Sequence, residues 1–301
     1  MTTYDFNDGN GPIPAHQHSN GGGWVADTAT VADTAYVELD ALVFGNAKVF
    51  GSAKVSGDAE VFGDAEVFGD AEVSGNARVY GNAKVFRNAK VFGNAEVYGN
   101  ARIYDNAKVY GNAKVFRNAR VFGNANVFGD ARVYGDAGVS GYAKVYGDAE
   151  VSGDALVSGN ARVSGNARVS GNALLYYNAR IFDEALVYGN ARVYGDAKVY
   201  GNAKVFGDAL VCNNALVFGD AEVSGDAIVC NNTRVYGDVE HKENKNMIDQ
   251  DKVIDWMESA FIAINDAHGN PKSIIEKLPK DLKETLIRND IHFVYKGKSM
   301  K

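Results

Sequence analysis

Valine and alanine alternate with polar residues along most of this chain, in a unit of six residues. Every sixth position from residue 25 to residue 235 holds valine, except for Ile103, Leu175 and Ile181, which makes 36 consecutive units without an insertion. From Ala29 onward, the position two residues before the valine is alanine in all but one unit. Alternate residues of a strand point to opposite faces, so valine and alanine share the inner face and the residue between them points outward.

A corner follows each of these short strands. Most units begin with glycine and then asparagine or aspartate, as in Gly45 and Asn46. Glycine and asparagine tolerate positive φ, and asparagine and aspartate side chains bond to nearby backbone in turns. One unit alone buries almost no apolar surface, so the units must stack to form a core. The pattern therefore predicts an all-β solenoid.

Three units make one coil of this solenoid. The sequence VCNN at residues 211–214 recurs at residues 229–232, three units later. Residues of one kind also recur at every third unit in the position after the valine, as expected if they stack. We predict 12 triangular coils of 18 residues, with a length of about 57 Å at about 4.8 Å per strand.

The unit G-[ND]-A-x-V-[FYS] resembles the repeat of the hexapeptide-repeat proteins, which include the hexapeptide acyltransferases. In those families an aliphatic residue and a small residue four positions later point inward. The sequence GGWV at residues 22–25, followed by runs such as ARVYGNAKV, is similar to bacterial and phage repeat proteins. The resemblance covers about residues 20–239 and implies a single-stranded left-handed parallel β-helix. It does not assign a function, because solenoids of this kind serve unrelated purposes.

Residues 1–20 lack the repeat, and residues 21–239 contain it. We expect residues 1–20 to form an irregular N-terminal cap over the first coil, since the ends of a solenoid need covering. Trp24, in the outward position of the first unit, is expected to pack against this cap. His16 and His18 could begin a metal site, but no cysteine or third histidine lies nearby, so an exposed loop is the favoured interpretation. We expect no metal site.

Residues 240–301 form a polar linker and then a small helical unit in our prediction. Ile254, Met257, Phe261 and Ile264 have helical spacing and predict a helix over residues 249–267. Shorter helices are predicted over residues 273–278 and 279–288, and a strand over residues 291–295. This small α-helical unit is expected to cap the last coil.

Charge and composition indicate the cellular location of the protein and the state of its cysteines. The net charge is −7, but acidic and basic residues are interleaved, so the total predicts no strong field. No run of about 18 apolar residues and no signal peptide is present, and we expect a cytoplasmic or virion-associated protein with no membrane contact. Cys212 and Cys230 stack in the predicted coils. A disulfide between them is conceivable, but we favour two reduced thiols.

The three outward faces differ in charge. The residues before the valine alternate in sign on the first face, as in Glu60, Arg78, Glu96 and Lys114, and such neighbours need no partner. The second face carries an apolar stripe, which we expect the C-terminal segment or another protomer to cover. The stripe consists of Leu156, Leu174, Leu210 and Ile228.

The third face combines basic residues with aromatic rings. Its outward residues include Lys90, Lys108, Lys144, Arg162, Arg180 and Lys198, and its rings include Tyr110, Tyr146 and Tyr200. Positive charge interleaved with rings is typical of surfaces that bind single-stranded nucleic acid or another acidic polymer. Lysine side chains lying over aromatic rings on a solvated face explain the pattern equally well.

Phenylalanine or tyrosine follows the valine in 23 of the 36 units, and serine follows it in eight. This exchange indicates an outward position, because a packed core would not tolerate it. Stacked rings would stabilise neighbouring coils by roughly 0.2–1 kcal/mol per pair, and they could also form a binding or self-association surface.

The residues that enzymes of this scaffold use are missing from the coils. The resemblance implies a histidine base and an acyl donor bound between protomers of a trimer, and related carbonic anhydrases hold a metal through histidines. All five histidines lie outside the coils, so we expect no catalytic residue, metal or cofactor there. The favoured function is a non-enzymatic rigid scaffold or assembly protein that meets a protein partner or itself. The alternatives are an acyltransferase-like enzyme with a site between protomers and a binder of an anionic polymer.

Overall fold

The structure is a computed structural model that describes residues 2–236, 293–295 and 298–300. The chain divides into two compact units, Met1–Glu243 and Asn244–Lys301. In the second unit, β39 (Phe293–Tyr295) and β40 (Lys298–Met300) pair antiparallel, and β39 lies within the strand predicted there. The linker and helices predicted between them and the coils lie outside the described residues.

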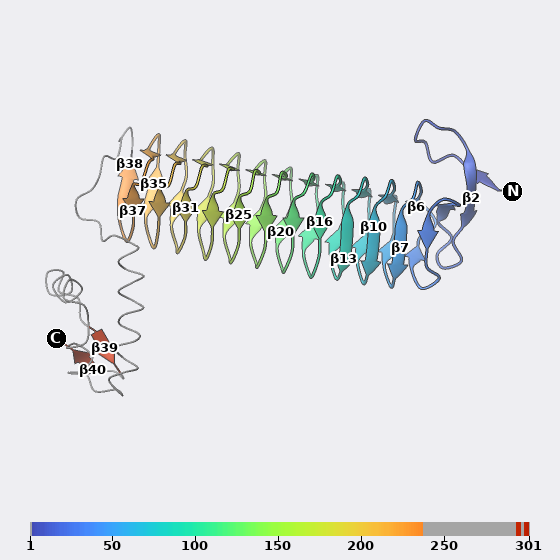
Figure 1. Cartoon of the computed structure of the whole chain (residues 1–301), viewed down its shortest axis with the longest axis horizontal. Helices are drawn as coiled ribbons and strands as arrows, with labels where there is room; N and C mark the ends of the chain where they lie inside the picture. Colours follow the sequence, from blue (N-terminus) through green and yellow to red (C-terminus); the bar gives the residue numbers. More distant parts are fainter. Residues whose placement is uncertain (1, 237–292, 296–297, 301) are drawn as a thin grey trace. The chain divides into compact units, whose positions relative to one another are not determined.

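The first unit is a parallel β-solenoid in which three sheets run along the stack of coils (Figure 1). Each coil adds one strand to each sheet, and Cα partners on neighbouring coils lie three repeat units apart in the chain, as Val79 and Val97 do. The second and third sheets have 12 strands each, and the first has 12 strands from the coils and two from the N-terminus. The predicted solenoid, with 12 coils of three units each, is therefore confirmed.

The strands are short and follow the repeat. The first sheet contains β3 (Trp24–Ala26), β6 (Leu42–Val43), β9 (Glu60–Val61), β12 (Arg78–Val79), β15 (Glu96–Val97), β18 (Lys114–Val115), β21 (Arg132–Val133), β24 (Glu150–Val151), β27 (Arg168–Val169), β30 (Leu186–Val187), β33 (Lys204–Val205) and β36 (Glu222–Val223). The second sheet contains β4 (Thr30–Val31), β7 (Lys48–Gly51), β10 (Glu66–Gly69), β13 (Lys84–Arg87), β16 (Arg102–Ile103), β19 (Arg120–Val121), β22 (Gly138–Val139), β25 (Leu156–Val157), β28 (Leu174–Leu175), β31 (Arg192–Val193), β34 (Leu210–Val211) and β37 (Ile228–Val229). The third sheet contains β5 (Tyr36–Val37), β8 (Lys54–Val55), β11 (Glu72–Val73), β14 (Lys90–Val91), β17 (Lys108–Val109), β20 (Asn126–Val127), β23 (Lys144–Val145), β26 (Arg162–Val163), β29 (Arg180–Ile181), β32 (Lys198–Val199), β35 (Leu216–Phe218) and β38 (Arg234–Tyr236).

The repeat alanines and valines fill the interior. From Ala35 to Val223 every one of them has an exposed fraction of 0 %, and together they form one continuous core. Burying a valine side chain stabilises a fold by roughly 1.5–3 kcal/mol relative to leaving it exposed. Each coil covers the alanines and valines of its neighbours, so stability belongs to the stack and not to a single coil.

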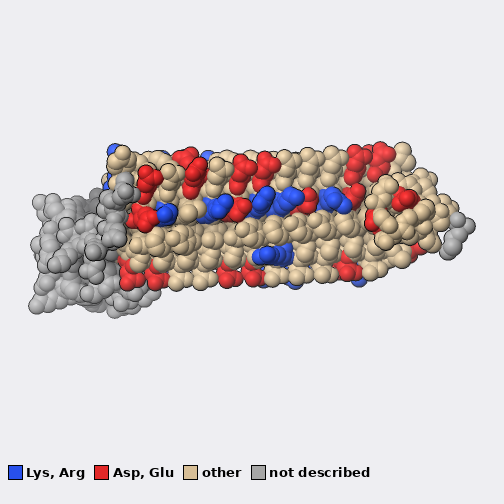
Figure 2. Space-filling view, turned by 90° about the horizontal axis from the view of Figure 1, so that it is seen from above, with Lys and Arg blue, Asp and Glu red and all other residues tan. Residues whose placement is uncertain are grey.

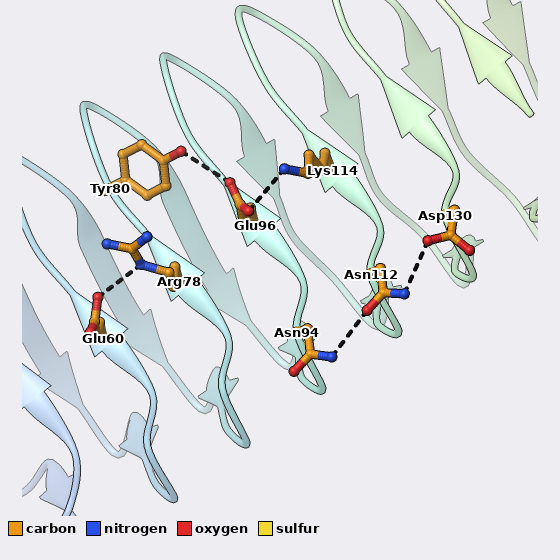
Figure 3. Close-up of polar contacts among 8 residues, drawn as sticks. All are labelled: Glu60, Arg78, Tyr80, Asn94, Glu96, Asn112, Lys114 and Asp130. Atoms are coloured by element: carbon orange, nitrogen blue, oxygen red, sulfur yellow. Dashed lines mark hydrogen bonds and ion pairs between the residues drawn. The ribbon is translucent and has the colours of Figure 1, made fainter. Parts of the chain in front are cut away.

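Side-chain amides join the corners of successive coils. Asn94 Nδ2 donates to Asn112 Oδ1 at 3.0 Å, and Asn112 Nδ2 donates to Asp130 Oδ1 at 3.0 Å (Figure 3). The sequence analysis expected such residues to bond to nearby backbone, but in these rows the partner is the next coil. A row ends at an aspartate because a carboxylate has no N–H group to donate onward.

The N-terminal segment is more regular than predicted. β1 (Thr3–Tyr4) and β2 (Ile13–Gln17) form an antiparallel hairpin, and β2 pairs antiparallel with β3 of the first coil. The cap is therefore an extension of the first sheet, because the open edge of the first coil offers unpaired backbone groups. Trp24 stacks on Tyr4 with ring centroids 4.5 Å apart, which confirms its predicted packing against the cap.

His18 is not in an exposed loop, contrary to the sequence analysis. It is 5 % exposed, and its Nε2 lies 3.0 Å from the carbonyl oxygen of Ala35, to which Asn20 Nδ2 also donates. In later coils the equivalent alanine carbonyl accepts a backbone N–H from the preceding coil. The first coil has no preceding coil, so these two side chains take that place. His16 is exposed and its Nδ1 lies 2.9 Å from Asp27 Oδ1.

Cys212 and Cys230 are joined by a disulfide, which corrects the prediction of reduced thiols. They follow the valines of the neighbouring strands β34 and β37, and their Cα atoms are 4.5 Å apart. This separation falls within the range of about 4.4–6.8 Å that disulfides span. The in-register stacking of two parallel strands is therefore compatible with the bond. In the described part of the chain, no helix is long and apolar enough to span a membrane.

Candidate functional site

Acidic and basic residues alternate along most of the outward positions of the first sheet, and Lys114 and Arg132 are its one like-charged pair in register. Arg78 Nε donates to Glu60 Oε2 at 2.8 Å, and Lys114 Nζ donates to Glu96 Oε1 at 2.9 Å (Figure 3). Each pair joins two neighbouring coils in register. In the view of Figure 2, a row of basic side chains runs along the unit with acidic side chains between them. The first sheet balances much of its own charge, as its sequence predicted.

The outward positions of the third sheet are basic over six consecutive coils, with one asparagine among them. In register along the sheet stand Lys108, Asn126, Lys144, Arg162, Arg180 and Lys198, which we call the basic column. Lys90 precedes the column and donates to Glu72 Oε2 at 2.7 Å. Among the described residues, none of the five basic side chains of the column forms an ion pair with a carboxylate.

Like charges are direct neighbours within the basic column. Lys144 is paired in register with Arg162, Arg162 with Arg180, and Arg180 with Lys198. Like charges directly opposite each other destabilise a strand pair. The fold does not impose a run of like charges of this length, because in the first sheet, which has the same geometry, each basic residue has an acidic residue in register beside it. A bound polyanion would remove the repulsion by neutralising the column.

Aromatic rings stack beside the basic column, at the corner where the third sheet ends. Tyr110 stacks on Phe92 and on Phe128, with ring centroids 4.8 and 4.9 Å apart, and Phe128 stacks on Tyr146 at 5.0 Å. Burial among these rings raises the pKa of Tyr110. Further along, Tyr200 stacks on Phe182 at 4.8 Å. These side chains are half-buried, so the rings both stabilise the coils and remain accessible at their edges.

Two exposed tyrosines stand at the opposite edge of the third sheet. Tyr142 and Tyr177 are 65 % and 64 % exposed and lie at the corner that leads into β23 and β29 respectively. Tyr177 replaces the usual corner glycine and has a φ of 57°. Holding a residue other than glycine in this region costs on the order of 1–3 kcal/mol. The ring is exposed and therefore accessible for contact at this edge of the sheet.

The predicted apolar stripe of the second sheet is not uniform. Leu156 is 49 % exposed and pairs in register with Leu174, whereas Leu210 is only 6 % exposed and pairs with Ile228. Arg192 separates the two pairs. Leu156 is therefore the most exposed residue of the stripe, while Leu174 and Ile228 are half-buried and Leu210 is buried.

The structure brings all the predicted residues of the third face onto one sheet and its corner. Their proposed role in binding stays a prediction. The sequence shows that this corner has the least regular glycine position and that Tyr177 is one of its departures, but the sequence analysis did not name Tyr177 as a site residue and missed Tyr142, which replaces asparagine. Departures from a strict repeat would have been the signal for finding them.

The chain is similar to one family model and to several solved structures. A family model described as a YdcK β-solenoid repeat matches residues 161–177 and 185–201. No curated protein matches the chain. The crystal structure of UDP-N-acetylglucosamine O-acyltransferase (LpxA) from Moraxella catarrhalis RH4 is 12 % identical, with a TM-score of 0.39 over 87 % of this chain and 93 % of that one. An Arabidopsis UDP-N-acetylglucosamine acyltransferase is also 12 % identical, with a TM-score of 0.35 over 89 % and 91 % of the two chains.

Proposed function

We propose that this β-solenoid is a rigid, non-enzymatic scaffold that binds an anionic polymer along its third sheet. The observation that carries the proposal is the basic column, in which like charges are neighbours and no carboxylate of the described residues pairs with them. A surface that binds a polyanion gains affinity from each phosphate or carboxylate that it neutralises. The coils present these charges at a regular spacing of about 4.8 Å, so they suit an extended chain.

The rings at both edges of the third sheet support the same proposal. Half-buried rings such as Tyr110 lie on one edge, and the exposed Tyr142 and Tyr177 lie on the other. Proteins that bind single strands combine a positive track with aromatic side chains. The first sheet has rings as well, but four of its five outward basic residues form ion pairs with glutamates of the same sheet. Charge therefore distinguishes the third sheet, and the rings add contact area.

Charge reversal tests the proposal. The variant Lys108→Glu, Lys144→Glu, Arg180→Glu should bind a fluorescent oligodeoxythymidylate and heparin at least about tenfold more weakly, and the slope of log K against log salt should fall by about 2. The matched control is Arg102→Glu, Arg120→Glu, Arg192→Glu, which changes the net charge equally on exposed positions of the second sheet. Fluorescence anisotropy measures both. Equal losses in the two variants, or no binding by the unmodified protein, would refute the proposal.

Self-association is a second proposal, favoured by the exposure of Leu156 on the second sheet. A protomer could cover Leu156 and Leu174 with the same face of a second copy, since exposed apolar patches mark interaction sites. The expected result is an oligomer by light scattering that becomes monomeric in Leu156→Glu. A mass that is the same in both proteins would remove this proposal, and a trimeric mass in both would instead support the trimer of the acyltransferase-like alternative.

The acyltransferase-like alternative needs a general base. His16 is paired with Asp27, and His18 is buried against the carbonyl of Ala35, so each of these two histidines already has a structural partner. A third histidine, His241, lies outside the described residues. A transferase activity in the purified protein that is lost in His16→Ala or His241→Ala would favour this alternative over the scaffold.

The GGWV sequence at residues 22–25 resembles bacterial and phage repeat proteins, and we propose a virion-associated setting over a cytoplasmic one. The disulfide between Cys212 and Cys230 supports this choice, because cytosolic glutathione keeps thiols reduced. Titration of free thiols in protein purified without reductant tests it. Two free thiols per chain would favour the cytoplasm.

A further inference from the structure

The aromatic column of the third sheet is interrupted once. Ser164 stands in the position that Tyr146 occupies one coil earlier and Phe182 one coil later. Stacked rings on successive coils have centroids 4.8–5.0 Å apart on both sides of the interruption. The space between Tyr146 and Phe182 is therefore that of one missing ring.

This single-ring gap distinguishes the third sheet from the other two. At the corner after the first sheet, Ser152 and Ser170 leave out two rings in succession, and after the second sheet Ser140 and Ser158 do the same. In a gap of two missing rings, a single flat group cannot contact an aromatic ring on both of its faces. Only the gap at Ser164 has an aromatic ring immediately above and below it.

A pocket of about 320 Å³ occupies the gap. Its floor is formed by Ser164 and Gly165, its two walls by Tyr146 and Phe182, and its rim by Arg162 and Arg180 of the basic column. This volume lies near the lower end of the range of about 300–1,000 Å³ typical of ligand sites. A pocket of this size suits one ring with one attached anionic group.

The rim and floor of the pocket suit the chemistry of a nucleotide. The guanidinium groups of Arg162 and Arg180 carry forked donors that match a phosphate, and each is exposed. The hydroxyl of Ser164 can donate to or accept from the edge of a base. Asp183 is the one carboxylate of the lining, and its Oδ2 accepts the backbone N–H of Gly201 at 3.1 Å. Its charge is therefore partly satisfied within the protein.

We propose that the gap at Ser164 takes one base of a single-stranded nucleic acid, stacked between Tyr146 and Phe182, with an adjacent phosphate on Arg162 and Arg180. The proposal rests on the proposed function, in which the basic column is the track for the polymer backbone. A flat aromatic base fits because the protein's own rings fill the equivalent position on neighbouring coils. The base would restore a continuous stack.

The variant Ser164→Phe tests the site by filling it with the protein's own ring. We expect affinity for an oligodeoxythymidylate to fall by about tenfold, the loss typical of one stacked base, with little change in the salt dependence. Affinity for heparin, which has no base, should stay within about twofold. The matched control is Ser152→Phe, which adds the same ring at a corner of another sheet and should change neither affinity.

An abasic oligomer of the same charge and length separates stacking from electrostatics. The unmodified protein should bind it about tenfold more weakly than the oligodeoxythymidylate, and Ser164→Phe should bind the two equally. Equal loss of heparin and oligonucleotide binding in Ser164→Phe would overturn the base site and indicate simple obstruction of the track. If heparin binds, and Ser164→Phe does not change oligonucleotide binding, the base site is overturned and the proposed function stands. If no oligonucleotide binds at all, the base site falls.

Discussion

The first and third sheets of this solenoid have the same geometry and opposite ways of placing charge. On the first sheet Arg78 lies against Glu60 and Lys114 against Glu96, so each of these basic side chains has an acidic neighbour one coil away. On the third sheet Arg162 and Arg180 are neighbours and neither has a carboxylate partner among the described residues. The backbone does not distinguish the two sheets. The difference shows that the outward residues can vary without changing the coil, because the inward valines and alanines form its core. The outward residues can therefore be selected for function.

The largest effect should come from giving the third sheet the charge pattern of the first. In the variant Arg162→Glu, Lys198→Glu, the column alternates in sign beside Lys144 and Arg180. Polyanion affinity should fall by roughly a hundredfold, because two contacts are lost and two repulsions are added. The melting temperature should rise, since opposite charges replace like ones. Anisotropy and thermal unfolding measure the two effects. A lower melting temperature would show that the like charges do not destabilise this sheet.

The reverse change should give the first sheet the character of the third. Glu96→Lys removes the ion pair with Lys114 and the hydrogen bond from Tyr80 Oη, and it makes four outward positions in succession basic, from Arg78 to Arg132. We expect a loss of about 1–2 kcal/mol in the free energy of unfolding, together with new polyanion binding on this sheet. Denaturant unfolding measures the first and anisotropy the second. Glu96→Gln is the control, and it should lose less stability because it keeps the side-chain volume.

A smaller effect is expected at the corner that leads into the third sheet. Tyr177→Gly relieves a φ of 57° and should stabilise the protein by about 1 kcal/mol. The same variant should bind the oligodeoxythymidylate about threefold more weakly, because one exposed ring that a base can stack on is lost. Tyr142→Asn restores the repeat residue without relieving strain, and only its binding should change. A gain in stability without a loss of binding in Tyr177→Gly would remove this ring from the proposed surface.

The smallest effect concerns the titration of Tyr80 on the first sheet. Burial, followed by the charge of Glu96 and its hydrogen bond, raises the pKa of Tyr80 to about 12 from its ordinary value of 10.0. Since the folded pKa is the higher one, the stability from the neutral phenol is present below pH 10.0 and is lost as the pH rises toward 12. Glu96→Gln should lower this pKa, which ultraviolet absorbance of tyrosinate measures. An unchanged pKa would show that burial alone sets it.

Periodic features of this chain were predictable, and most of the features that break the period were not. The valine spacing predicted the core, and the recurrence of VCNN after three units predicted the register that pairs Val211 with Val229. The same recurrence placed Cys212 against Cys230, but only the structure shows that they are bonded. The burial of His18 could not be predicted, because it depends on the unpaired carbonyl of Ala35 at the first coil.

The candidate site divides in the same way. The basic column was visible in the sequence, because every third unit falls on one sheet once the coil length is known. The pocket at Ser164 was not, since a serine in this position also occurs where no pocket with two ring walls is formed. Its meaning depends on Tyr146 and Phe182, which lie one coil before and one coil after Ser164 and become its walls only through stacking.

The sequence by itself determined the solenoid, its coil length and the sign of charge on each sheet, because each of these follows from a strict period in residues near one another in the chain. The tertiary structure decided the hairpin on the first coil, the disulfide and the gap at Ser164. These features depend on which backbone groups and side chains lie opposite each other across coils. Hydrogen bonding along the stack sets the distance between coils. No local pattern in the chain specifies which side chains and backbone groups remain unpaired or which spaces remain unfilled at that distance.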